Sequence, residues 1–177
     1  LGWNPGTDQE IFSLAELIKQ FSLAKVQKGG AIFNLEKLKW LNREYLKTAG
    51  NSVWESIFTA DWPMALRAKV IPIIRERVAT LTEGESLIAS GEYDYFRSAP
   101  IVDRSLLKTP ATLSKTIISL DAIPEIDFTA SQVKAALWPY AEEAGRAAVL
   151  WPLRVALTGK ERSPDPFTVA SILGKQE

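Results

Sequence analysis

The sequence contains no cysteine and no histidine. Without cysteine there is no disulfide and no thiol nucleophile, and without histidine there is no imidazole base near pH 7. The same absences exclude serine–histidine–aspartate triads and zinc sites built from these ligands. Catalysis would have to use carboxylates, lysines or metals held by oxygen atoms. The lack of cysteine is consistent with a cytoplasmic protein, which we expect here.

Motifs that bind phosphate or calcium are also missing, since no GxxxxGK[ST], GxGxxG or DxDxDG segment occurs. No run of about 18 apolar residues occurs, so the sequence predicts no membrane-spanning helix. The apolar fraction of 46% and the charged fraction of 24% are typical of a globular protein. The formal net charge is zero. A nucleic-acid-binding role would therefore need a local basic patch and selective contacts, because bulk attraction is lacking.

Paired carboxylates are the remaining candidates for catalysis. They occur at Glu83/Glu85, at Glu92/Asp94 and at Glu142/Glu143. Carboxylate chemistry of the glycosidase type needs a defined separation across a cleft, and no nucleophile with an adjacent base accompanies these pairs. We expect them to be solvated charges at helix ends, so that this chain alone is not an enzyme.

The apolar pattern is helical almost throughout, which predicts an all-α fold class. A capping box, Ser13 to Glu16, predicts a helix that ends near residue 21. Asn34 is placed to cap a second helix that ends near Gly50. The buried stripe expected on this second helix consists of Leu35, Leu38, Leu41 and Tyr45.

Prolines and glycines divide the rest of the chain. Pro63 and Pro72 each suit the first turn of a helix, so two helices are expected between residues 63 and 81. Trp151-Pro152 is likewise expected to begin a helix. Residues 90–105, which include an aromatic run, are predicted to be a linker between two helical subdomains. The other helices are expected over residues 82–89, 109–122, 129–144 and 164–173.

Basic residues form two groups, one at residues 67–77 and one at residues 154–162. Either group is explained by a solvated helix face or by a binding patch. The loop 159–166 favours the second interpretation, because it combines the donors Lys160, Arg162 and Ser163 with a rigid Pro-Asp-Pro segment. Loops of this kind beside an aromatic residue are typical of proteins that read single-stranded RNA.

Two long segments resemble one family. LGWNPGTDQEIFSLAELIKQFSLAKVQKGGAIFNLEKLKWLN resembles the segment after the KMSKS-type loop of bacterial glutamyl-tRNA synthetases, and LWPLRVALTGKERSPDPFTVASILGK is similar to their C-terminal signature. The resemblance spans the chain and is weaker over residues 50–145. It implies the helical-cage anticodon-binding domain of a class I aminoacyl-tRNA synthetase. Residues 1–48 would be the end of the stem-contact region, and residues 49–89 and 90–177 the two anticodon-binding subdomains.

The resemblance also implies what this chain does not do. The family's HIGH-like motif needs histidine, which is missing, and no KMSKS-like motif occurs. The chain is therefore expected to be part of a glutamate–tRNA ligase without the catalytic half, which would bind ATP and Mg²⁺. The implied partner is the anticodon loop of tRNA(Glu). We expect a monomer that uses no cofactor or metal of its own and contacts no membrane.

Site residues follow from the same resemblance. The arginine of the PLR signature is Arg154, and the loop positions that approach the anticodon are Ser163 and Pro166. Lys160, a donor in that loop, completes this group. The arginine of the ERV segment is Arg77, which in discriminating members contacts the third anticodon base. We expect Arg77 to favour cytosine, which offers two acceptors on its Watson–Crick edge, over guanine, which offers donors.

One alternative of a different class remains open. The apolar and aromatic faces of the helices also suit a helical protein-interaction module with no role in RNA binding. Loss of anticodon stem-loop binding in an Arg154→Ala variant would favour the synthetase interpretation.

Overall fold

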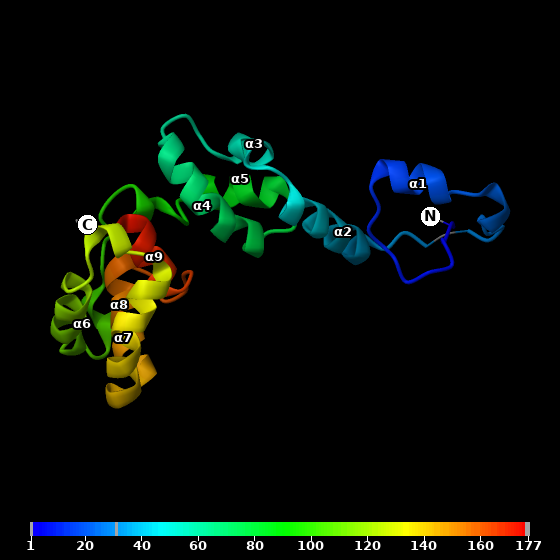
Figure 1. Ribbon diagram of the computed structural model, residues 1–177. Helices are drawn as coiled ribbons and strands as arrows, with labels where there is room; N and C mark the ends of the chain where they lie inside the picture. The colour runs from blue at the N-terminus through cyan, green and yellow to red at the C-terminus, as the bar shows by residue number, and fades with distance from the viewer. Residues whose placement is uncertain (1, 31, 176–177) are drawn as a thin grey trace.

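The computed structural model describes residues 2–30 and 32–175, and in these residues the regular secondary structure is helical apart from one isolated antiparallel bridge, Trp3–Val26 (Figure 1). The prediction of an all-α fold is confirmed. The first helices lie at one end of an elongated molecule and the last four at the other (Figure 1). The α-helices are α1 Leu14–Gln20, α2 Leu35–Thr48, α3 Asn51–Trp54, α4 Met64–Arg77, α5 Leu81–Ala89, α6 Thr112–Asp121, α7 Ala130–Ala144, α8 Arg146–Thr158 and α9 Pro166–Leu173.

The N-terminal part has little interior. The capping box is confirmed, because the Ser13 hydroxyl accepts from the Glu16 amide and the Glu16 carboxylate accepts from the Ser13 amide. However, no residue of α1 is buried, and the Leu14 and Ile18 side chains are 74% and 69% exposed. The aromatic rings of Trp3 and Phe21 lie 5.8 Å apart. A small aromatic cluster therefore takes the place of a core in this part of the chain.

Helix α2 begins as predicted but packs differently. The Asn34 side chain accepts from the Lys37 amide at 2.9 Å, so the predicted cap is confirmed. The predicted buried stripe is wrong, because Leu35, Leu38 and Tyr45 are exposed and Leu46 is the residue of α2 that is buried. The reason is tertiary: α2 leads from the N-terminal part into the first subdomain, and it packs there against α4.

Two helices continue through proline where the sequence predicts a new start. Pro72 lies inside α4, and Pro152 lies inside α8, which begins at Arg146. An interior proline removes one backbone hydrogen bond and crowds the preceding turn. In α4 the buried side chains of Val70, Ile71 and Ile74 flank Pro72 on both sides. Their burial, at about 25 cal/mol per Å² of apolar surface, offsets the lost hydrogen bond.

The aromatic run inside the predicted linker is part of the interior. Tyr93, Tyr95 and Phe96 are buried, and the Tyr95 and Phe96 rings lie 4.5 Å apart. They belong to the core of the first subdomain, and Val169 of α9 joins the same core. The two subdomains thus meet through packed side chains. The interpretation as a linker is wrong for the aromatic run, whereas most of residues 97–105 is exposed.

The second subdomain consists of α6 to α9 around a second core. Thr129 caps the start of α7 and Gly145, with a φ of 96°, ends it, which agrees with the helix predicted over residues 129–144. Helix α8 ends at Gly159, whose φ is 67°. A Cβ atom there would lie 2.6 Å from the carbonyl oxygen of Ile101, so only glycine fits. This close approach fixes where the loop after α8 leaves the helix.

Among the residues that the structure describes, no helix is long and apolar enough to cross a membrane.

Candidate nucleic-acid interface

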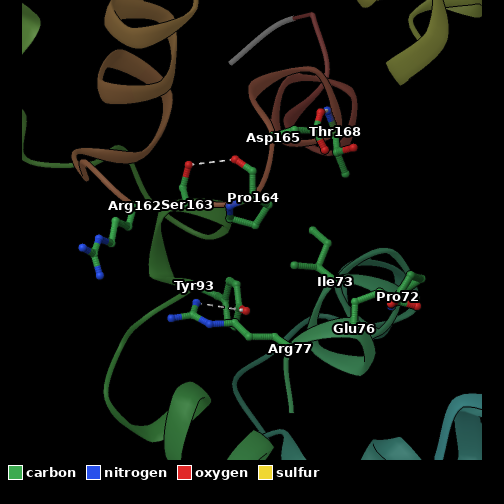
Figure 2. Close-up of a pocket in the computed structure, with 10 residues that line it drawn as sticks. All are labelled: Pro72, Ile73, Glu76, Arg77, Tyr93, Arg162, Ser163, Pro164, Asp165 and Thr168. Carbon is green, nitrogen blue, oxygen red and sulfur yellow. Dashed lines mark hydrogen bonds between the residues drawn. The ribbon is translucent and has the colours of Figure 1, made fainter. Parts of the chain in front are cut away.

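A cleft of about 650 Å³ lies where the two subdomains meet (Figure 2). Both subdomains contribute to it: α4 forms one wall, and the loop 159–165 with the start of α9 forms the other. Two predicted site residues, Arg77 and Ser163, therefore come together although they are distant in the sequence. The lining residues are Pro72, Ile73, Glu76, Arg77, Tyr93, Arg162, Ser163, Pro164, Asp165 and Thr168.

Glu92 connects the two walls of this cleft. Nη1 of Arg77 donates to one oxygen of the Glu92 carboxylate at 2.6 Å, and Nζ of Lys160 donates to the other at 2.6 Å. The Lys160 ammonium also donates to the Glu92 backbone carbonyl at 2.8 Å. Burial by itself would raise the pKa of Glu92, but the hydrogen bonds from Lys160 and Arg77 outweigh it and hold the pKa below its usual value. Glu92 is thus a charged link between the subdomains.

Arg77 is anchored through one nitrogen. Besides Glu92, Nη1 donates to the Tyr93 hydroxyl at 3.4 Å, and the guanidinium lies 5.9 Å from the centre of the Tyr93 ring. These hydrogen bonds, that to Glu92 above all, raise the pKa of Arg77 further. Within residues 2–30 and 32–175, Nε and Nη2 of Arg77 have no hydrogen-bond partner, and its side chain is 45% exposed. Arg77 therefore keeps donors available for a ligand.

Arg154 is unusual among the arginines. Three arginines in the described part of the chain are half-buried, namely Arg67, Arg75 and Arg154. Arg67 donates to two backbone carbonyls and to Glu55, and Arg75 donates to the Ala49 carbonyl and to Asn51. Arg154 has no such partner in the described residues, and its Nε is buried. Nε of Arg75 is also buried without a partner, but Nη2 of Arg75 is hydrogen-bonded, whereas neither Nη atom of Arg154 has an acceptor in the described residues. Because an unpaired half-buried guanidinium is unfavourable, Arg154 suits an acceptor from a ligand.

The loop after α8 leads to two other predicted site residues, Ser163 and Pro166, and of these two Ser163 lines the cleft. Ser163 is half-buried in the cleft, where its hydroxyl donates to the Pro164 carbonyl at 2.9 Å. Pro166 is buried as the first residue of α9, behind the Asp165 side chain that caps this helix. In its place Pro164 lines the cleft.

Several functional candidates were missed in the sequence. Tyr93 and Thr168 line the cleft, and Glu92 holds its two walls together. The aromatic run that contains Tyr93 is a visible signal in the sequence, although it lies in the segment predicted to be a linker. Nothing in the local sequence distinguishes Glu92 from an ordinary surface glutamate.

The acidic pairs have structural partners. Glu83 accepts from the Ala79 amide at the start of α5, and Glu142 accepts from the Trp138 indole and from Arg146. Glu83 and Glu142 therefore fit the prediction of charges at helix ends. Glu92 does not fit it, because its side chain is only 21% exposed. Within the described residues no group of three or more acidic side chains is placed to hold a metal ion.

A family model described as the anticodon binding domain matches residues 13–177. The chain belongs to this family. The glutamate–tRNA ligase of Flavobacterium johnsoniae is 33% identical over 192 residues, which cover 100% of this chain and 37% of that protein. The glutamate–tRNA ligase of Clostridium novyi is also 33% identical, over 199 residues that cover 100% of this chain and 39% of the relative.

A solved structure gives the same result. The crystal structure of glutamate-tRNA synthetase from Elizabethkingia anophelis is similar to this chain with a TM-score of 0.76 and 28% identity, over 99% of this chain and 36% of that one. The resemblance noted in the sequence is confirmed: the anticodon-binding chain corresponds to the helical portion of a class I synthetase. It spans little more than a third of the length of the curated relatives it matches.

Proposed function

We propose that this chain is the part of a glutamate–tRNA ligase that binds the anticodon loop of tRNA(Glu). The rest of the enzyme would bind ATP and Mg²⁺ and attach glutamate, while this portion works in the cytoplasm as a monomer without a cofactor. The observation that carries the proposal is Arg154, a half-buried arginine on a packed helix that has no acceptor among the described residues. A base or phosphate of an RNA loop supplies such an acceptor.

The cleft supports the same function. The unpaired bases of an anticodon loop expose both a flat face and a hydrogen-bonding edge. The apolar side chains of Ile73 and Pro164 suit the face, and Arg77 and Ser163 suit the edge. Cytosine accepts two hydrogen bonds from a guanidinium, whereas guanine presents donors to it, and such a mismatch costs about 1–3 kcal/mol. Arg77 would therefore favour a tRNA with cytosine as the third anticodon base by roughly ten- to a hundred-fold.

Binding of a fluorescently labelled anticodon stem-loop of tRNA(Glu), followed by anisotropy, tests the proposal. The Arg154→Ala variant should bind at least about tenfold more weakly, because a hydrogen-bonded charge contributes roughly 1.5–3 kcal/mol. Arg43→Ala is the matched control. Arg43 is an exposed residue of α2, a helix that lies at a distance from α6 to α9 (Figure 1), and its loss should change the Kd less than about twofold.

The outcomes separate the two functional classes. Equal Kd values for Arg154→Ala and Arg43→Ala would contradict base or phosphate binding by Arg154. No binding of the stem-loop by the unaltered protein would favour the protein-interaction alternative.

A further inference from the structure

We propose, on the basis of the proposed function, that Glu92 is a positioning residue that makes RNA binding selective. Its single carboxylate holds two cations of the binding region, Arg77 from α4 and Lys160 from the loop after α8. By holding them it reduces the affinity for RNA in general and increases the preference for the correct base.

The contacts of Glu92 are divided between its two oxygens. Oε1 accepts from Arg77 and Oε2 from Lys160, each at 2.6 Å, and its backbone carbonyl accepts from Lys160 as well. Lys160 is 68 residues away in the sequence, so these bonds join separate elements. Charge-assisted hydrogen bonds of this length are strong, and with a side chain only 21% exposed Glu92 is poorly screened by solvent.

The arrangement restricts Arg77 without using all of its donors. An arginine that is 45% exposed would otherwise sample many rotamers. Glu92 and the Tyr93 hydroxyl both engage Nη1, which leaves Nε and Nη2 unpaired in the described part of the chain. Figure 2 shows the Arg77 side chain reaching from α4 beneath Tyr93, toward the side of the cleft where Arg162 lies. A guanidinium held in one orientation can distinguish hydrogen-bond acceptors from donors on a base.

Without Glu92 the two cations would behave differently. Arg77 and Lys160 would repel each other, move independently and pair with RNA phosphates, which carry no sequence information. Affinity for any RNA loop would rise and its dependence on salt would become steeper, while discrimination between bases would fall. If Glu92 only stabilised the fold, its loss would instead lower the affinity for every RNA loop, because partial unfolding would weaken binding.

The experiment compares two anticodon stem-loops, one with cytosine and one with guanine as the third anticodon base. Dissociation constants are measured by anisotropy at several KCl concentrations for the unaltered chain and for Glu92→Gln. We expect the ratio of the two constants to fall at least about fivefold in Glu92→Gln, mainly because the guanine loop binds more tightly. The slope of log K against log salt should steepen by about one to two, as for one or two added phosphate contacts.

Glu76→Gln is the matched control. Glu76 lines the same cleft and is exposed, and no hydrogen bond or ion pair joins it to Arg77 or Lys160 in the described residues. Its replacement by glutamine removes the same charge. A general electrostatic effect would change the dissociation constants of both loops equally and leave their ratio unchanged. Glu92→Asp, which keeps the charge, should recover part of the selectivity.

A second measurement does not depend on RNA. The ¹⁵N relaxation of the Arg77 Nε–H group should show a more mobile side chain in Glu92→Gln than in the unaltered chain or in Glu76→Gln. Unchanged mobility, or a selectivity ratio that Glu92→Gln leaves unchanged, would overturn the inference and leave the proposed function intact. If the unaltered chain bound neither loop, the proposed function itself would fail, and the role of Glu92 in selectivity with it.

Discussion

The half-buried arginines of the two subdomains differ in their hydrogen-bond partners. In the first, Arg67 and Arg75 donate to backbone carbonyls and neighbouring side chains, so these bonds hold the fold together, although Nε of Arg75 is buried without a partner. In the second, Arg154 is held at a similar depth with no acceptor among the described residues. The comparison shows that the available acceptors, rather than burial or position on a helix, separate structural arginines from those that suit a ligand.

The largest effect on stability is expected for Arg67→Ala. Arg67 donates to the carbonyls of Trp62 and Thr59 and pairs with Glu55 at 3.2 Å, so its loss leaves several groups without a partner. We expect the free energy of unfolding to fall by about 2–4 kcal/mol, measured by urea denaturation. Arg154→Ala should change it by less than about 0.5 kcal/mol, because no intramolecular bond is lost. Similar losses of stability in the two variants would contradict the comparison.

Gly159→Ala should have the next largest effect. An alanine at position 159 would have to adopt a φ of 67°, and its Cβ would lie only 2.6 Å from the Ile101 carbonyl oxygen. We expect a loss of about 2–3 kcal/mol in unfolding free energy and weaker RNA binding, because the loop that carries Ser163 must move. Gly29→Ala is the control, since no atom lies within 4 Å of its added Cβ. A Gly159→Ala variant as stable as Gly29→Ala would show that the loop has room to adjust.

The smallest effect is a dependence of stability on pH. The pKa of Glu92 is lowered in the folded chain, so its ionised form stabilises the fold above about pH 4.5, the usual value for glutamate. This contribution is lost as the pH falls through the lower pKa of the folded state. The difference in unfolding free energy between the unaltered chain and Glu92→Gln should therefore be largest at neutral pH and shrink toward pH 3. A difference independent of pH would argue against the ionic link.

Part of the candidate site was predictable from the sequence. The resemblance identified Arg77 and Ser163, which the structure brings into one cleft, and Arg154, whose side chain has no partner in the described residues. Lys160 is predicted to be an exposed donor, but it is half-buried and pairs with Glu92. Pro166 is buried, and its place in the lining is taken by Pro164.

The sequence by itself determined the features that depend on neighbouring residues. The caps formed by Ser13, Asn34 and Thr129 join side chains to amides three residues away, and such bonds form wherever the local sequence allows them. The helical class and the family follow from patterns of the same local kind. Only the tertiary structure decided that α4 and α8 continue through their prolines, that the aromatic run is buried, and that Glu92 joins Arg77 to Lys160. These outcomes depend on contacts between residues far apart in the chain, whose energies outweigh local preference and leave no trace in any short segment of sequence.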